Sequence, residues 1–496
     1  MKLKNIFTIL IVCLLLVCTV GAISAVSDDN DLTVTDQSDD LVSVSNDEQL
    51  SVSDEDALAA PQQETSLQVD AGVAPSPAQT QTTAAPSLTP LQQLTQDLEN
   101  KKSVIYLTGD IKLTKPFDIW YNVVIDGQGH TVDGQSRTSM FRGHACTMTL
   151  KNIVFKNGYD AQGGAVYSLY GNLNVENCIF QDNTAYDNGG AIYQSGGTLT
   201  VKNSQFISNK VDSSRKECHG GAIYLYNGHA KISKSVFKYN TCISKLLKKH
   251  SQATKYQFGG GAVYLNEGSN HEIEECEFTG NKASNHGGAV YAYKAKSLKI
   301  NKCIFKKNRS LFEDGGAITF NNGKKLTIKN SKFYNNRAYE DGGVMDAVSN
   351  SKKTYITITG CLFQGNIANK GGGVFWMGLK SVFTIKNSKF IKNKATIGGT
   401  FVGEDTSSKV SNCLFQGNKA TKVTSWKMRA KDGHILKFSG GVIMMEKRSV
   451  KFFKCTFKGN SATYGGVAFH KSGKLSFTKC KYSANKAKSG PKTYPK

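Results

Sequence analysis

The chain has 496 residues and a formal net charge of +23, and its 48 glycines against 8 prolines argue against a helical protein, because glycine in a helix interior costs about 0.5–1 kcal/mol relative to alanine. Beyond residue 25, no apolar run approaches the ~20 residues of a transmembrane helix, which excludes a polytopic membrane protein. Residues 26–100 hold 15 Asp and Glu without Lys or Arg, whereas the chain from residue 101 onward has a net charge of +36 and is expected to attract polyanions.

Residues 1–25 have the pattern of a secretory signal peptide. Lys2 and Lys4 precede a long apolar run, and the small residues that follow predict cleavage after Ala22 or Ala25. An uncleaved membrane anchor is the alternative interpretation. Export predicts a location outside the cell or at the cell surface, where nucleic acid is not an expected partner.

Residues 26–90 are predicted to form a disordered acidic linker. They are rich in Ser, Asp, Thr, Gln, Ala and Pro and have no hydrophobic period. Leu91, Leu94 and Leu98 are then spaced as on one face of a helix, which predicts a short amphipathic helix. We therefore expect residues 91–140 to form an N-terminal cap and a first coil.

A repeat of about 27 residues extends over residues 141–487 and leaves a basic tail, 488–496. Its first element is Phe-x-x-Asn, at Phe180, Phe206, Phe237, Phe278, Phe305, Phe333, Phe363, Phe390, Phe415 and Phe457, with variants at Phe155 and Tyr482. Its second element is a Gly-Gly pair, usually followed by Ala, then Ile or Val, then Tyr. A fixed period of this size is typical of a solenoid.

Within each repeat, apolar residues alternate with period 2, which predicts three short strands per repeat. The sequence therefore predicts an all-β fold, a single right-handed parallel β-helix of about 12 coils. Leucine-rich repeats need a Leu/Asn consensus that is absent here, and propeller blades need about 40 residues. Two longer intervals indicate ordinary coils that carry inserted loops near residues 242–257 and 420–438.

The paired signatures, as in Gly189–Ile192 and Phe278–Asn281, resemble the repeats of the chlamydial polymorphic outer-membrane proteins. The segment Ile125–Thr131 looks like the first coil of secreted β-helix proteins, and methanogen adhesin-like proteins share both features. The resemblance covers about 350 residues and implies a surface-exposed, adhesin-type protein. Unlike the polymorphic proteins, this chain is expected to lack an autotransporter barrel, because few residues follow Asn485.

Two columns of the repeat have structural interpretations. Seven cysteines lie two residues before the aromatic of the motif, namely Cys178, Cys276, Cys303, Cys361, Cys413, Cys455 and Cys480. Other coils have Ser there, so we predict small, inward, free thiols rather than disulfides or a metal site. The Asn of the motif is expected to tolerate a left-handed turn and to bond the next Asn along the stack.

Four carboxylates are the candidates for chemistry. Glu313-Asp314 and Glu340-Asp341 each precede a Gly-Gly pair in adjacent coils, so they are expected to stack and to repel one another. A Ca²⁺ site formed by all four residues is one interpretation, and a catalytic acid pair of Asp314 and Asp341 is another. No other cofactor is expected.

Two arginines provide a structural explanation for the same carboxylates. Arg309 and Arg337 follow the Asn of their own coils and lie in the same turn, where they would neutralise the acidic side chains. The sequence favours this compensation. A β-helix lyase would need about three carboxylates with a nearby Arg or Lys base, so the sequence favours a protein that is not an enzyme.

The candidate ligand-binding residues come from two features. The tyrosines of the Gly-Gly element recur at Tyr167, Tyr193, Tyr224, Tyr264 and Tyr291. Since Ile or Val faces inward, the rings are expected to stack outward, either as a docking stripe for sugar rings or as a stabilising cover of the sheet. The inserted loops supply Lys248, Lys249, Trp426, Lys427 and Arg429, which suit an acidic glycan but are equally explained as tolerated insertions.

The sequence thus predicts a monomeric, secreted or cell-surface, adhesin-like protein that binds acidic polysaccharide or a cell-envelope glycan. The alternative is a pectate-lyase-like polysaccharide lyase or glycosidase that acts on acidic glycans. Both share the β-helix architecture, and a fold alone does not decide between them.

Overall fold

The computed structural model describes residues 87–214, 217–246, 258–349, 353–421, 439–490 and 492–494. The predicted signal peptide, nearly all of the predicted linker and most of both predicted inserts lie outside the described residues.

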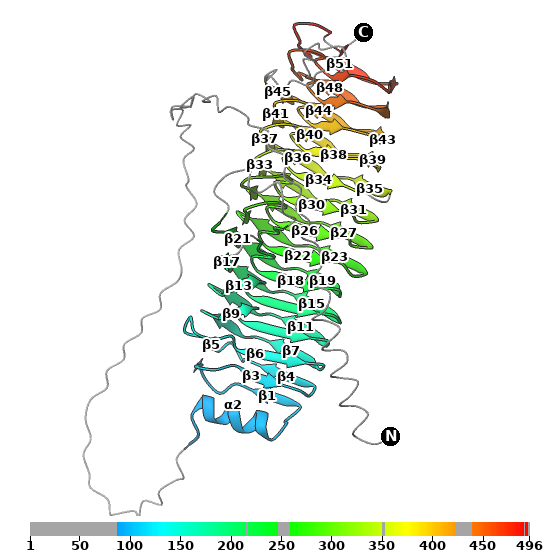
Figure 1. Ribbon diagram of the computed structural model, residues 1–496. Helices are drawn as coiled ribbons and strands as arrows, with labels where there is room; N and C mark the ends of the chain where they lie inside the picture. The colour runs from blue at the N-terminus through cyan, green and yellow to red at the C-terminus, as the bar shows by residue number, and fades with distance from the viewer. Residues whose placement is uncertain are drawn as a thin grey trace, which may run out of the picture. The chain divides into compact units, whose positions relative to one another are not determined.

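Helix α2, Pro90–Glu99, lies at the N-terminal end of the stacked coils (Figure 1). Its N-terminus has a capping box, in which the Gln92 N–H donates to Thr89 Oγ1 over 3.3 Å and the Thr89 N–H donates to Gln92 Oε1 over 2.9 Å. Leu94 is buried in the main core, so the predicted amphipathic helix is confirmed. No helix of the described residues is long and apolar enough to cross a membrane.

Four parallel sheets form the coils. Sheet A consists of β1 (Val104–Tyr106), β4 (Val123–Asp126), β7 (Thr147–Lys151), β11 (Asn172–Glu176), β15 (Thr198–Lys202), β19 (His229–Ser233), β23 (Asn270–Glu274), β27 (Ser297–Asn301), β31 (Lys325–Lys329), β35 (Thr354–Thr359), β39 (Ser381–Lys386), β43 (Thr406–Ser411), β47 (Arg448–Phe453) and β50 (Lys474–Thr478). Sheet B consists of β2 (Ile111–Lys112), β5 (Thr131–Asp133), β8 (Val154–Lys156), β12 (Ile179–Gln181), β16 (Gln205–Ile207), β20 (Val236–Lys238), β24 (Glu277–Thr279), β28 (Ile304–Lys306), β32 (Lys332–Tyr334), β36 (Leu362–Gln364), β40 (Lys389–Ile391), β44 (Leu414–Gln416), β48 (Thr456–Lys458) and β51 (Lys481–Ser483).

Sheet C consists of β3 (Phe117–Ile119), β6 (Phe141–His144), β10 (Val166–Leu169), β14 (Ile192–Ser195), β18 (Ile223–Tyr226), β22 (Val263–Asn266), β26 (Val290–Tyr293), β30 (Ile318–Asn321), β34 (Met345–Val348), β38 (Phe375–Met377), β42 (Phe401–Gly403), β46 (Ile443–Met445), β49 (Ala468–His470) and β52 (Thr493–Tyr494). Sheet D is shorter and consists of β9 (Tyr159–Gln162), β13 (Thr184–Asn188), β17 (Lys210–Ser213), β21 (Thr241–Ser244), β25 (Lys282–Ala283), β29 (Arg309–Ser310), β33 (Arg337–Ala338), β37 (Ile367–Ala368), β41 (Lys394–Ala395) and β45 (Lys419–Ala420).

Neighbouring strands of each sheet come from successive coils, which confirms the predicted parallel β-helix (Figure 1). In sheet B, for example, Phe180 of β12 pairs with Phe206 of β16, so the repeat places equivalent residues directly above one another. The twelve motif positions account for β8 to β51 of sheet B. Two further coils, containing β2 and β5, precede the first motif.

Sheet D was not predicted, because its strands follow the Asn of Phe-x-x-Asn, where a turn was expected. Many of them are two residues long, too short to show a period. Strands β21 and β45 pair regularly with their neighbours in this sheet, so the two inserts begin later than residues 242 and 420.

The motif asparagines form a hydrogen-bonded ladder inside the coils. Asn183 Nδ2 donates to Asn209 Oδ1 over 2.9 Å and to the carbonyl of Phe155 over 3.1 Å, and equivalent bonds continue to Asn485. The predicted bonding between asparagines is therefore confirmed. The expected left-handed conformation is wrong, because it belongs to the preceding residue, such as Asp182 with a φ of 55°, which turns the chain so that Asn183 points inward.

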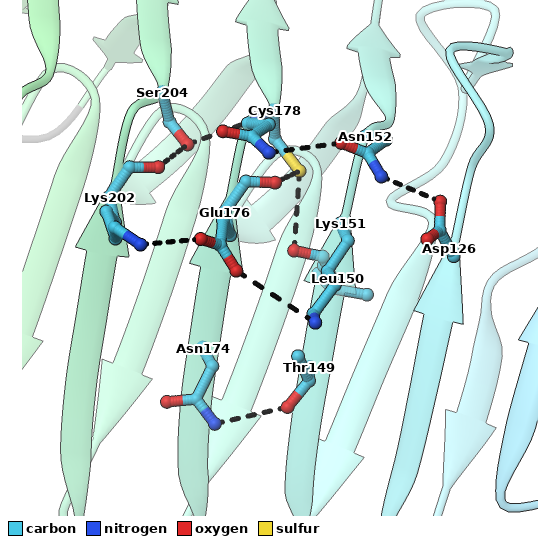
Figure 2. Close-up of polar contacts among 11 residues, drawn as sticks. Asp126, Thr149, Leu150, Lys151, Asn152, Asn174, Glu176, Cys178, Lys202 and Ser204 are labelled. Atoms are coloured by element: carbon cyan, nitrogen blue, oxygen red, sulfur yellow. Dashed lines mark hydrogen bonds and ion pairs between the residues drawn. The ribbon is translucent and has the colours of Figure 1, made fainter.

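The cysteines are free thiols, as predicted, and nine of the ten described are buried. Figure 2 shows Cys178 beside Leu150, whose carbonyl accepts a hydrogen bond from Sγ over 3.5 Å. The Cys178 N–H donates to Oγ of Ser204, the equivalent residue of the next coil, over 3.1 Å. Either Cys or Ser can occupy this position of the repeat, because both side chains fill the small space and hydrogen-bond to the backbone.

The Gly-Gly pairs make turns that exclude side chains. Gly189 has a φ of 64°, which is unfavourable for other residues. A Cβ on Gly190 would lie 2.1 Å from the carbonyl oxygen of Gly221, the equivalent residue of the next coil. The first glycine is therefore required by its positive φ, and the second by the close approach of the next coil's backbone.

Candidate functional site

One column of side chains follows the outer face of sheet C, and we call it the outer column. In register, it consists of Arg142, Tyr167, Tyr193, Tyr224, Tyr264, Tyr291, Thr319, Asp346, Trp376, Val402, Met444 and Phe469. The predicted tyrosines thus stack on the side away from the main core. The rings of Tyr167 and Tyr193 are nearly parallel, with centroids 5.1 Å apart.

The expectation that all these tyrosines form an exposed stripe is wrong. Tyr224, Tyr264 and Tyr291 are 7%, 2% and 0% exposed. The turn residue His219 packs edge-on against Tyr264 with ring centroids 4.7 Å apart, and His286 lies 5.8 Å from Tyr291. These rings form a small second core outside sheet C, which favours the stabilising interpretation for them.

The N-terminal end of the outer column does expose aromatic rings. Trp120 is 71% exposed and stacks on His144, with centroids 4.2 Å apart, and His144 lies 6.2 Å from Tyr167. Tyr170 is 73% exposed, and Tyr193 is half-buried. We call these five residues the aromatic platform. Trp120, His144 and Tyr170 were not predicted from the sequence, because they lie outside the Gly-Gly-Ala-Ile/Val-Tyr element.

A cluster of carboxylates lies where the outer column changes from Tyr to Thr and Asp. One oxygen each of Asp314, Glu340 and Asp341 lies within 4.8 Å of the others, so the predicted stacking of the acidic turns is confirmed. Asp314 Oδ1 accepts the N–H of Asp341 over 2.9 Å, and Asp341 Oδ1 accepts the N–H of Gly371 over 2.6 Å. The backbone thereby fixes the direction of both aspartates.

Burial and mutual repulsion shift these groups strongly. Burial, with the charges of Asp314 and Glu340, raises the pKa of Glu313 to about 9. Burial also raises the pKa of Asp314 and Asp341 above the usual range, and in Asp341 the charge of Asp314 adds to the shift. The pKa of Asp346 is raised by burial and by the charge of Asp314. Such a cluster holds protons or a cation at neutral pH.

The expected compensation by Arg309 and Arg337 is not what the structure shows. Both side chains are exposed, and among the ion pairs that join described residues none links either arginine to these carboxylates. Lys370 forms an ion pair with Glu340 instead. The alternation of the two-residue strands β29 and β33 explains the difference, because each strand turns its Arg outward and its second residue inward.

Among the described residues, two groups of side chains could hold a metal ion. The first, Asp314, Glu340 and Asp341, belongs to the predicted Ca²⁺ site. The second consists of His286, Glu313 and Asp314, and it adds a histidine that spacing along the sequence did not single out. Asp346 was also missed, because its coil lacks the Tyr that marks this column.

The candidate residues Lys248, Lys249, Trp426, Lys427 and Arg429 lie outside the described residues, so their role stays a prediction. Lys245, which lies within the predicted range of the first insert, is described. Its Nζ lies 3.0 Å from Oδ2 of Asp212 in the preceding coil, so its charge is matched by a neighbouring coil.

The family described as the right-handed beta helix region matches residues 119–282, 216–420 and 350–491. The three overlapping matches together cover well over half of the chain, and they agree with the fold class predicted from the repeats. No curated protein and no solved structure matches the chain.

Proposed function

We propose that this chain, which belongs to the right-handed β-helix family, is an adhesin-like, cell-surface protein that binds acidic polysaccharide along the outer face of sheet C. The β-helix fold is compatible with adhesins and with proteins that act on polysaccharides, so the choice rests on the site and not on the fold. The aromatic platform is the observation that carries the proposal.

The platform offers flat apolar faces at a fixed spacing on a rigid sheet. Trp120 and Tyr170 leave most of their surface in water, although neither is needed to cover the main core. Aromatic rings that combine an apolar face with a polar tip are suited to ligands with both characters, as sugars have. Strands β6, β10 and β14 hold the neighbouring rings in register, so little order has to be imposed when a glycan binds.

Charge favours an acidic glycan over a neutral one. The net charge of +36 from residue 101 onward attracts a polyanion over long range. Export, which the predicted signal peptide indicates, would bring the protein to where such glycans occur. The resemblance of the repeats to those of polymorphic outer-membrane proteins and methanogen adhesin-like proteins supports the same assignment.

The test is a glycan array probed with the parent chain and with the double variant Trp120→Ala/Tyr170→Ala. We expect acidic polysaccharides to bind, and the double variant to lose affinity by about tenfold or more. Tyr239→Ala is the matched control, because Tyr239 is also largely exposed, at 60%, but follows β20 of sheet B. Binding by the double variant that equals that of the control would refute the role of the platform.

A polysaccharide lyase or glycosidase is the second candidate, and the carboxylate cluster favours it. Glycosidases pair a protonated and an ionised carboxyl group, and raised pKa values at Asp314 and Asp341 could supply such a pair. Lys370 adds the nearby cation that the sequence did not predict. Release of unsaturated uronate or reducing ends by the parent chain, abolished in Asp314→Asn, would establish the enzyme; we expect binding without release.

A further inference from the structure

Three successive coils place a metal-binding side chain immediately before their Gly-Gly pair. These residues are His286, Asp314 and Asp341. The Gly287 N–H donates to the carbonyl of Asp314 over 3.1 Å, and the Gly315 N–H donates to that of Asp341 over 3.0 Å, so the three lie in register. The ladder spacing of about 4.8 Å therefore brings their side chains together without a contribution from any loop.

Glu313 completes a compact group with the first two of these residues. One ligand atom each of His286, Glu313 and Asp314 lies within 4.8 Å of the other two. A single ion placed between such atoms can reach all of them at normal bond lengths of about 2.0–2.2 Å after small side-chain movements. Distances of this kind also occur in acidic clusters that hold no ion.

Two buried polar atoms at this cluster point to a ligand. His286 is 7% exposed, and its Nδ1 has no hydrogen-bond partner among the described residues. Asp346 is 3% exposed, and its Oδ1 likewise has no partner there. Besides burial, the negative charges of Asp314 and Glu313 raise the pKa of its carboxyl group, so these groups lie near one another. A buried polar atom without a partner destabilises the fold, so each points to a missing ligand.

We propose that His286, Glu313 and Asp314 bind a divalent transition-metal ion, and that the carboxylate of Asp346 stabilises its charge. An imidazole nitrogen among carboxylate oxygens favours Zn²⁺ and similar first-row ions. Ca²⁺ prefers six to eight oxygen ligands, so the histidine argues against it. The site lies away from the aromatic platform and doesn't depend on glycan binding.

His219 is an internal comparison for His286. Both precede a Gly-Gly pair and pack against tyrosines of the outer column. Nδ1 of His219, however, lies 2.7 Å from Asn188 Oδ1, so that nitrogen is satisfied by an amide. The equivalent nitrogen of His286 has no partner among the described residues, and one ring nitrogen of this imidazole lies within 4.8 Å of carboxylate oxygens of Glu313 and Asp314. The same repeat position therefore serves packing in one coil and, in our proposal, metal binding in another.

Electrostatics supports a cation at this place. Carboxylates crowded at low dielectric repel one another unless a positive charge compensates them. Lys370 supplies one such charge and pairs with Glu340. An ion between His286 and Asp314 would place a double positive charge against the remaining carboxylates.

The test is calorimetric titration of the chelator-treated full-length chain with Zn²⁺, Mn²⁺ and Ca²⁺. We expect Zn²⁺ to bind more tightly than Ca²⁺, and His286→Gln to weaken Zn²⁺ binding by about tenfold or more. His219→Gln is the matched control and should bind as the parent does. Asp314→Asn, which keeps the side-chain volume, provides a second variant if His286→Gln fails to fold by circular dichroism.

Thermal unfolding gives an independent readout, because an ion that binds only the folded state raises Tm. Zn²⁺ should raise the Tm of the parent and of His219→Gln but not that of His286→Gln. Preference for Ca²⁺, parent-like Zn²⁺ affinity in both His286→Gln and Asp314→Asn, or equal losses in the two histidine variants would each overturn the proposal. The platform variant Trp120→Ala/Tyr170→Ala should keep the ion, so the two proposals fail separately.

Discussion

The asparagine ladder and the outer column of sheet C obey the same stacking rule, yet only the ladder is uniform. In the ladder, each amide donates to one neighbour and accepts from another, as Asn308 and Asn336 do over 3.0 Å, so every coil needs the same residue. In the outer column, packing depends on shape, and Tyr291 is followed in register by Thr319 and Asp346. A column with the same residue in every coil therefore serves stability. In a column that accepts several residue types, the position where the type changes is the place to look for a function.

Breaking the ladder should have the largest effect. In Asn336→Ala, the amide of Asn308, the carbonyl of Phe305 and Oδ1 of Asn366 each lose a hydrogen bond of 3.0 Å. We expect a local loss of about 3–5 kcal/mol, because several buried groups are left unsatisfied. The measurement is protease sensitivity in increasing urea, with cleavage sites mapped by mass spectrometry.

The adjacent residue provides the control for this variant. Asn335 is exposed with a φ of 53°, so Asn335→Gly should change stability little. Because coils contact mainly their neighbours, cleavage should concentrate near the altered coil. Uniform cleavage along the whole β-helix in Asn336→Ala would contradict this nearest-neighbour behaviour.

The outer column should show a smaller effect that depends on position. Tyr264 is buried between His219 and its neighbours, so Tyr264→Ala should cost about 3 kcal/mol, at the lower end for a buried aromatic ring. Tyr170→Ala, at the exposed end, should cost under about 0.5 kcal/mol. Urea midpoints of the two variants measure the difference, and similar costs would mean that the column is packed alike along its length.

This contrast also explains what could be predicted from the sequence. The coils could be predicted, because the asparagine ladder and the Gly-Gly turns require the same residues at a fixed period. The burial of Tyr264 could not be predicted. Its ring is covered by His219, which lies in a turn, and the contacts of this turn follow no sequence period. Asp346 stands where other coils have Tyr, after Gly342-Gly343-Val344-Met345, so aligning the coils by their Gly-Gly pairs would have found it.

The charge partners of the acidic cluster could not be predicted from the sequence either. Sequence spacing indicated that Glu313 and Glu340 stack, but the compensating cation was assigned to arginines in the same turn. The ion pair joins Lys370 and Glu340, which lie in turns of adjacent coils, whereas the short strands β29 and β33 turn their arginines outward. Two-residue strands carry too little pattern for that direction to be predicted.

Acid should weaken the fold through histidines held neutral in its interior. His271 lies inside sheet A, where it accepts the N–H of Ala230 at Nδ1 over 3.3 Å, and burial lowers its pKa to about 4. The unfolded chain takes up the proton near pH 6.5, so stability is lost as pH falls from about 6.5 to 4, by up to about 3 kcal/mol. His271→Leu, which matches Leu298 of the next coil, should reduce this loss.

Urea midpoints at pH 7 and pH 4.5 measure the effect of His271. The pKa of His219 is also lowered to about 4 by burial, so the variant should keep part of the acid sensitivity. An unchanged difference between the two midpoints would show that His271 is protonated in the folded protein.

The smallest effect on stability is expected in the column two residues before the motif aromatic, where some coils have Cys and others have Ser. Cys303 donates from Sγ to the carbonyl of Asn301 over 3.2 Å, and Ser331 of the next coil makes the same bond to Lys329 over 2.7 Å. Cys303→Ser should therefore cost under about 1 kcal/mol, since the hydroxyl keeps the hydrogen bond. In the parent, Cys303 should resist alkylation while the partly exposed Cys480 reacts. Ready labelling of Cys303 in the folded protein, or a large loss of stability in Cys303→Ser, would show that this column isn't the interchangeable small-residue position that its stacking indicates.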